Sequence, residues 1–128
     1  MKTRATIAFA MIAGFGLGAV AIEGLHAQAK PPVYVVTEID ISNPDAYIKE
    51  YAPLAQASVR NHGGKLLAAS SKPTSIEGQP PKRIAVSLWE DMGKVEGWRK
   101  SDEYQKARIT GNKYAKFRTF AVEGLPQK

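Results

Sequence analysis

Cysteine is absent from this 128-residue chain, and histidine occurs only twice. The lack of cysteine excludes disulfides, thiolate zinc sites, cysteine nucleophiles and a lipoprotein anchor. Only His62 lies in the part of the chain that we expect to fold, which excludes a zinc site with several histidine ligands within one subunit. Calcium loops, phosphate-binding loops and the G-x-S-x-G motif are also missing from the sequence. We therefore predict no metal and no other cofactor.

The composition is that of a folded domain, with 44% hydrophobic and 23% charged residues. A chain of this length has room for one domain of ordinary size. The formal net charge is +6, but the basic residues are scattered among acidic ones and form no basic stripe. The charge pattern therefore predicts a solvated surface and no nucleic-acid partner.

The first 29 residues have the three parts of a secretory signal peptide. The start is basic, an uncharged run follows from Ala5 to Ile22, and Ala27-Gln28-Ala29 supplies the small residues that a signal peptidase requires. We place the cleavage after Ala29, which predicts a mature domain of residues 30–128 in the periplasm or outside the cell, with no membrane attachment. The alternative is a retained single-span anchor, because the uncharged run is just long enough to cross a bilayer.

A strand and a helix open the predicted domain. Residues 33–41 alternate with a period of two and are rich in β-branched side chains, which indicates a strand. Asn43 and Pro44 are typical of a helix start, and Gly63 is placed to end the helix in a left-handed conformation. Pro53 should disturb this helix near Lys49, since proline has no backbone N–H. The apolar stripe of the helix comprises Tyr47, Tyr51, Leu54, Ala55 and Val59.

The second half of the domain repeats the pattern of strands and a helical region. Strands are predicted at 64–70, 82–90 and 116–123, with a loop at 71–81. A helical region begins at Asp91, and Ser101 caps a new helical turn inside it. The element order β-α-β-β-α-β predicts an α+β, ferredoxin-like fold, in which a four-stranded antiparallel sheet carries two helices on one face.

The other face of this sheet is expected to be apolar. We predict that it carries Tyr34 and Val36 from the first strand, Ala85 and Trp89 from the third, and Phe120 and Val122 from the fourth. Soluble monomers rarely expose so large an apolar patch, so we expect two sheets to stack in a homodimer. The alternative is a monomer in which the lead-in or the loop Ser71–Pro81 covers the sheet. The ligand-pocket residues predicted for a small apolar molecule in this cleft are Tyr34, Val36, Trp89 and Phe120.

Four segments resemble the bacterial family called domain of unknown function 1330. They are the opening Pro32 to Tyr47, the helix end Asn61 to Gly64, the segment Trp98 to Gln105, and Val122 to Gly124. The resemblance implies a dimeric α/β-barrel, related in fold to small monooxygenases and muconolactone-isomerase-like proteins. It implies no reaction, because the family has no established activity and fold alone does not determine function.

Three ionisable residues are weak catalytic candidates. His62 is the candidate for proton transfer, because a histidine changes charge near neutral pH; alternatively it stabilises the end of a helix. Glu38 and Asp40 lie two residues apart on the first strand, so their side chains share a face. If that face lines a cleft between subunits, one carboxylate can act as an acid or base; otherwise both are solvated or pair with Arg83 or Arg118.

Two functions remain open at this point. The first is an exported homodimer without assigned activity that binds a small, mostly apolar molecule. The second is a cofactor-independent enzyme of the monooxygenase or isomerase kind, acting on a small aromatic or lactone substrate. An enzyme needs an enclosed cavity with ionisable groups converging on it, whereas a packing dimer has its cleft filled by side chains.

Overall fold

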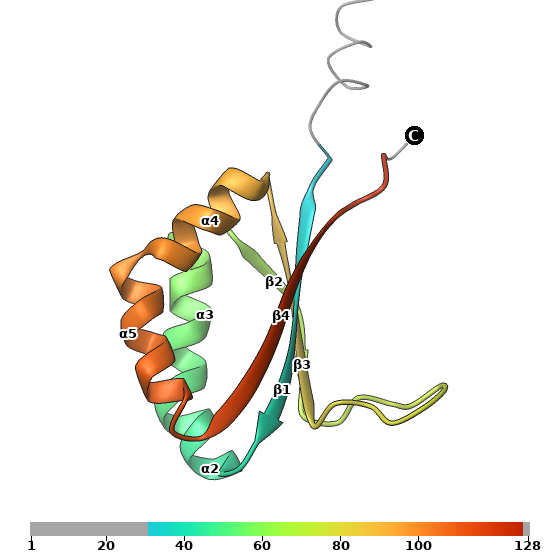
Figure 1. Cartoon of the computed structure of the whole chain (residues 1–128), viewed down its shortest axis with the longest axis vertical. Helices are drawn as coiled ribbons and strands as arrows, with labels where there is room; N and C mark the ends of the chain where they lie inside the picture. The colour runs from blue at the N-terminus through green and yellow to red at the C-terminus, as the bar shows by residue number, and fades with distance from the viewer. Residues whose placement is uncertain (1–30, 127–128) are drawn as a thin grey trace, which may run out of the picture. The chain divides into compact units, whose positions relative to one another are not determined.

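The computed structural model describes residues 31–126 (Figure 1). The predicted signal peptide lies outside these residues. Strands and helices follow in the order β-α-β-β-α-β, which confirms the predicted α+β, ferredoxin-like fold. The elements are β1 (Val33–Ile41), α2 (Pro44–Ala46), the π-helical segment η1 (Tyr47–Tyr51), α3 (Ala52–Asn61), β2 (Lys65–Ser70), β3 (Arg83–Trp89), α4 (Met92–Lys100), α5 (Asp102–Gly111) and β4 (Ala115–Glu123).

The four strands form one antiparallel sheet in the order β2-β3-β1-β4. β1 is paired on both sides, so that Val33 lies opposite Trp89 of β3 and opposite Glu123 of β4. Because side chains alternate along a strand, this register determines which residues share a face. The helices lie on one face of the sheet, as predicted, and leave the other face open (Figure 1).

Apolar side chains from the covered face form the core with the helices. Val33 and Val35 of β1 and Trp89 of β3 are each only 1% exposed. The Trp89 ring lies 5.0 Å from that of Trp98 on α4, which in turn lies 4.7 Å from the ring of Tyr104 on α5. Burying a large apolar side chain contributes about 1.5–3 kcal/mol, so this aromatic row is a main attachment of α4 and α5 to the sheet.

The first helical segment begins where its sequence predicts, and its regular α-helical geometry is interrupted before Pro53. The Oδ1 atom of Asn43 accepts a hydrogen bond from the backbone N–H of Ala46, and Pro44 occupies the first turn. Pro53 donates no backbone hydrogen bond, and the turn before it is the π-helical segment η1. Gly63 follows α3 with a positive φ of 92°, which confirms the predicted helix end.

Leu54 corrects the predicted apolar stripe of this helix. Its side chain is 46% exposed, whereas Tyr51, Ala52 and Val59 are buried. The π-helical turn contains more residues per turn than an α-helix, so it shifts the phase of the residues that follow. Ala52 thereby faces the core, and Leu54 faces solvent.

Two capping residues divide the second helical region into α4 and α5. The carboxylate of Asp91 accepts a hydrogen bond from the backbone N–H of Lys94 at 3.0 Å and begins α4. The Oγ atom of Ser101 accepts from the backbone N–H of Tyr104 at 3.1 Å and begins α5, as predicted. The caps let the two helices change direction at Ser101.

The open face of the sheet carries a band of apolar side chains. Phe120 and Val122 on β4 are 47% and 56% exposed. The prediction that Trp89 and Ala85 lie on this face is wrong, because both pair with covered-face positions of β1. Each face of β3 offers apolar residues, so local alternation does not tell which one meets the helices. The band comprises Tyr34, Val36, Ile84, Val86, Leu88, Phe120 and Val122.

The segment between β2 and β3 projects away from the sheet on the side opposite the helices (Figure 1). It spans residues 71–82, and Ile76 within it is 90% exposed. The predicted loop is therefore present, but it does not cover the apolar band, since Phe120 and Val122 remain exposed.

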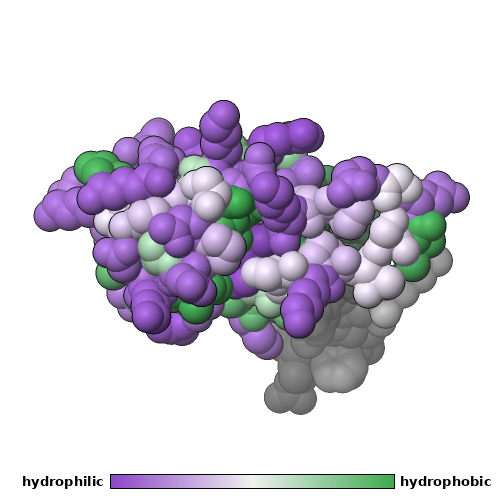
Figure 2. Space-filling model, turned by 90° about the horizontal axis from the view of Figure 1, so that it is seen from below, coloured by the Kyte–Doolittle hydropathy of each residue, from purple (hydrophilic) through white to green (hydrophobic). Residues whose placement is uncertain are grey.

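The lower end of the domain presents a mostly hydrophilic surface. Seen from below, hydrophilic side chains cover most of the visible face, and hydrophobic ones form separate patches (Figure 2). Scattered exposed apolar residues of this kind are normal for soluble domains. In residues 31–126, no helix is both long and apolar enough to span a membrane.

Candidate functional site

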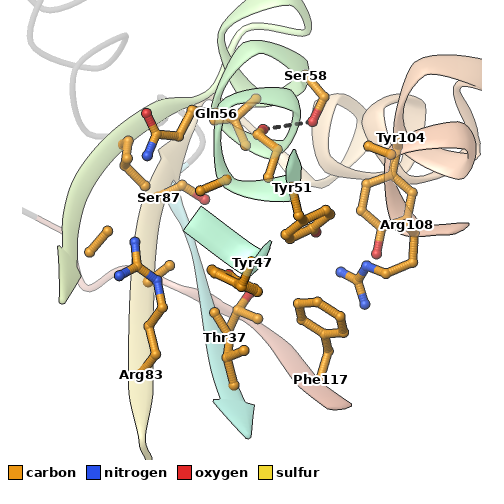
Figure 3. A pocket seen from close by; sticks show the side chains of 18 of the residues that line it. Thr37, Tyr47, Tyr51, Gln56, Ser58, Arg83, Ser87, Tyr104, Arg108 and Phe117 are labelled. Carbon is orange, nitrogen blue, oxygen red and sulfur yellow. Dashed lines mark hydrogen bonds between the residues drawn. The ribbon is translucent and has the colours of Figure 1, made fainter. Parts of the chain in front are cut away.

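A pocket of about 70 Å³ lies between the helices and the covered face of the sheet (Figure 3). Small side chains leave this space where larger ones would fill the core. Gln56, Leu66 and Ala69 are only half-buried or exposed, which places the opening between α3 and the edge strand β2. The small residues that line the pocket are Ala52, Ala55, Ala69, Ala85 and Ala107.

The π-helical segment supplies two tyrosines to the pocket. The rings of Tyr47 and Tyr51 are 5.2 Å apart, and the Tyr51 ring lies 5.3 Å from that of Phe117 on β4. Tyr51 fits closely over α5 because residue 111 is glycine: a Cβ atom there would come within 2.6 Å of the Tyr51 ring. The π turn thus places two hydroxyl-bearing rings in one wall of the pocket.

Burial keeps both tyrosine hydroxyls protonated. Burial raises the pKa of Tyr51 to about 12, and the nearby positive charge of Arg108 offsets only part of this effect. Burial also raises the pKa of Tyr47, against the opposing effect of the Arg83 charge and its hydrogen bond. At neutral pH both hydroxyls are therefore available as hydrogen-bond donors.

Arg83 lies on the covered face of β3 and lines the pocket. Its side chain is 9% exposed, and its guanidinium carbon lies 5.5 Å from the centre of the Tyr47 ring. One terminal nitrogen, Nη1, donates to the Oγ atom of Ser71 at 2.9 Å. The buried Nε atom has no hydrogen-bond partner. A buried donor without a partner is costly unless something else satisfies it.

Arg108 on α5 lines the pocket from another side (Figure 3). Its guanidinium carbon lies 3.8 Å from the centre of the Phe117 ring and 5.0 Å from that of Tyr104. The two ring faces stabilise its charge through cation–π contacts. The Nε atom of this arginine is also buried without a hydrogen-bond partner.

Carboxylates are missing around both arginines. Among the pocket-lining residues in the described part of the chain there is no Asp and no Glu. The ion pairs found within residues 31–126 are Lys82 with Asp40, at 3.1 Å, and Arg118 with Glu38, at 3.7 Å. Two arginines therefore face a partly apolar pocket without a carboxylate partner.

The sequence of the chain matches the model of one protein family. The model of the family described as domain of unknown function 1330 (DUF1330) matches residues 32–125. The chain belongs to this family. The resemblance noted in the sequence is thereby confirmed, and no curated protein matches the chain.

Solved structures share the fold of this DUF1330 chain at low sequence identity. The methylated RPA0582 protein of Rhodopseudomonas palustris is 11% identical, with a TM-score of 0.62 over 82% of this chain and 90% of that one. SnoaB, a cofactor-independent oxygenase from Streptomyces nogalater, is 9% identical, with a TM-score of 0.58 over 76% and 96%. HapK from Hahella chejuensis is 12% identical, with a TM-score of 0.57 over 75% and 95%. Identities this low show a common fold and no common activity.

The predicted catalytic candidates of this DUF1330 chain lie outside the pocket. The Nδ1 atom of His62, just after α3, lies 2.8 Å from the backbone carbonyl of Ser58. Glu38 and Asp40 both lie on the other face of the sheet, in the ion pairs given above. Pairing of Glu38 with Arg118 was one of the expected alternatives, whereas Arg83 lies on the opposite face and pairs with neither carboxylate.

The predicted ligand-pocket residues are divided between the two faces. Tyr34, Val36 and Phe120 lie together on the open face, in the apolar band. Trp89 lies on the covered face and packs against Trp98. The four side chains therefore do not line one cleft.

Sequence reasoning did not single out the two pocket arginines or the two π-helical tyrosines as a site. One signal was present for Arg83: it alternates with Ala85, Ser87 and Trp89, so it falls on the face of β3 that contains the tryptophan. A charged residue in register with a buried tryptophan indicates a polar site inside the fold. As for metals, residues 31–126 contain no group of three or more Asp, Glu, His or Cys side chains that could hold an ion.

Proposed function

We propose that this DUF1330 protein binds a small, mainly apolar molecule in the pocket between its helices and its sheet. The observation that carries the proposal is a partly enclosed cavity with apolar walls and a few convergent polar groups, which is the usual make-up of a ligand site. The site differs from the one expected between two sheets, because Arg83, Tyr47 and Tyr51 gather on the helix-covered side.

The pocket can be tested by filling it. Ala85→Leu places extra atoms in the cavity, and Ala121→Leu makes the same change at an exposed position that does not line it. Short-chain amides and acids such as butyramide and butyrate serve as probes in NMR titrations of the ¹⁵N-labelled full chain. We expect saturable shifts at pocket residues in the wild type and in A121L, and none in A85L. Shifts in none of the proteins would contradict the proposal.

We also propose that two copies pair through the open faces of their sheets. The apolar band on this face is larger than the isolated apolar residues elsewhere on the described surface, and a second copy offers the same band in return. Sedimentation at micromolar concentration should give a dimer. Phe120→Glu should yield monomers, whereas Ile109→Glu, at a 66% exposed position on α5, should not. A monomeric wild type would contradict the pairing.

Export is the third part of the proposal. The basic start, the uncharged run and Ala27-Gln28-Ala29 support a signal peptide cleaved after Ala29. N-terminal sequencing of the protein from a periplasmic fraction should begin at Lys30. Recovery of the chain with Met1 in the membrane fraction would instead support a retained anchor.

A cofactor-independent oxygenase or isomerase is the second candidate function. The observation that favours it is the protonated hydroxyl of Tyr51 beside Arg108, which can donate a hydrogen bond to a substrate oxygen. An aromatic substrate requires side chains to move, because a cavity of about 150 Å³ is needed for benzene. Incubation with small aromatics and lactones, followed by mass spectrometry and an oxygen electrode, tests it. Turnover that is lost in Tyr51→Phe would support this function, and no turnover would reject it.

A further inference from the structure

We propose that the pocket is an anion site that takes a short-chain organic carboxylate, with Arg83 as the group that binds the carboxylate. This inference rests on the proposed function and adds the charge and class of the ligand. Arg83 is nine-tenths buried, lines the cavity and has a buried Nε atom without a hydrogen-bond partner. Guanidinium groups match carboxylates in geometry and bind them through paired N–H donors.

The rest of the lining has the polarity that such a ligand requires. An arginine stays positively charged at any pH that the fold tolerates, so a buried one normally pairs with an acid. Within residues 31–126, neither ion pair of the chain involves Arg83, and the pocket wall contributes no Asp or Glu. The polar side chains that contact Arg83 are the hydroxyls of Tyr47 and Ser71, which are neutral. The charge of Arg83 is therefore left for a ligand to neutralise.

Arg83 is better placed than Arg108 to bind the anion. The guanidinium of Arg108 stacks on Phe117 and lies near Tyr104, so two ring faces already compensate its charge. Arg83 has one ring contact, with Tyr47 at 5.5 Å, and its hydrogen-bond partner Ser71 is neutral. It lies toward β2, where the pocket opens. Figure 3 shows the two arginines on opposite sides of the Tyr47 and Phe117 rings.

The size and walls of the cavity define the body of the ligand. The carboxylate binds Arg83 at the opening, so only the short chain has to fit in the cavity of about 70 Å³, which has about half the volume of one that accommodates benzene. The walls beyond Arg83 are mostly apolar, with Ala85 and Leu66 on the sheet and Ala55 on α3. A carboxylate with a short aliphatic chain matches both parts of the pocket, since its carboxylate group binds Arg83 and its chain packs against the apolar walls.

The decisive comparison uses two probes of nearly the same shape. Butyrate and butyramide differ in charge, and each is titrated into the ¹⁵N-labelled full chain. We expect butyrate to bind at pocket residues about tenfold more tightly than butyramide, since a hydrogen bond to a charged group contributes this much or more. Equal affinities would overturn the anion site and leave the proposed pocket intact. No binding of either probe would overturn both.

Variants test whether Arg83 causes the higher affinity for butyrate than for butyramide. Arg83→Gln should lower the affinity for butyrate about tenfold and leave that for butyramide unchanged. Arg60→Gln is the matched control, because Arg60 is exposed on α3 and does not line the pocket. Arg83→Lys keeps the charge, and we expect an intermediate affinity. If R83Q does not fold, the affinity of R83K for butyrate and the wild-type affinities for the two probes test the proposal instead. An equal loss in R60Q, or butyrate shifts confined to the surface, would overturn the proposal.

Discussion

The indole Nε1 atom of Trp98 donates a hydrogen bond to the Oγ atom of Ser58 over 3.0 Å, and this contact joins α4 to α3. Ser58 is 1% exposed, and its hydroxyl in turn donates to the backbone carbonyl of Ala55 at 2.8 Å. A tryptophan in a core needs a partner for its N–H group, and a serine on the facing helix supplies it. The two helices are thereby held in one relative position above the pocket.

Ser58→Ala should destabilise the protein by about 1–3 kcal/mol, because it leaves the buried N–H group of Trp98 without an acceptor. Urea unfolding followed by tryptophan fluorescence measures the change. Ser75→Ala is the control in the exposed segment between β2 and β3, and it should change stability by no more than about 0.5 kcal/mol. Equal effects of both variants would show that the bond to Trp98 contributes nothing.

Gly64→Ala and Gly97→Ala should change stability in opposite directions. A Cβ atom at Gly64 would lie 2.5 Å from the Trp89 ring and 2.7 Å from Val59, so G64A should cost about 1–3 kcal/mol through overpacking. Around Gly97, in α4, a Cβ atom would meet nothing within 4 Å, and G97A should gain about 0.5–1 kcal/mol from helix propensity. The urea midpoints of G64A, G97A and the wild type measure these two changes in stability. A stabilised G64A would contradict the packing of Trp89 on this glycine.

Stability should fall as the pH rises from 10 to 12. Burial raises the pKa of Tyr51 from the ordinary 10.0 to about 12, so the folded state holds its proton after the unfolded chain has lost it. The contribution is complete below pH 10, is lost as the pH approaches 12, and amounts to about 2–3 kcal/mol. Denaturant titrations across this window should show a smaller loss in Tyr51→Phe. Tyr34→Phe, on the open face, should follow the wild type; a Y51F profile identical to that of the wild type would contradict the prediction.

Ser101→Ala should cost about 1 kcal/mol, because the Oγ atom of Ser101 is the cap that accepts from the backbone N–H of Tyr104. Ser101→Asp provides an oxygen in the same place and should retain most of the stability. Thermal unfolding of the wild type, S101D and S101A measures their order of stability. If S101D were as unstable as S101A, capping would not be the reason for the serine.

Local sequence patterns predicted the secondary structure because they act within a few residues. The alternation of residues 33–41, the caps at Asn43 and Ser101 and the positive φ at Gly63 all depend on neighbouring backbone and side chains. The order of the elements then allowed few topologies, and the ferredoxin-like one was found. Pro53 likewise indicated a disturbed turn, although not that the turn would be π-helical.

Only the tertiary structure decided which face of each strand meets the helices and where the site lies. β1 and β3 are apolar on both faces, so the pairing of Trp89 with Val33 had to come from the register and from helix packing. The pocket joins Arg83, Arg108 and the π-helical tyrosines from elements far apart in the chain. The sequence by itself determined the elements and their order, since these depend on local hydrogen bonding and periodicity. The convergence of side chains depends on packing across the whole domain, which no local pattern contains.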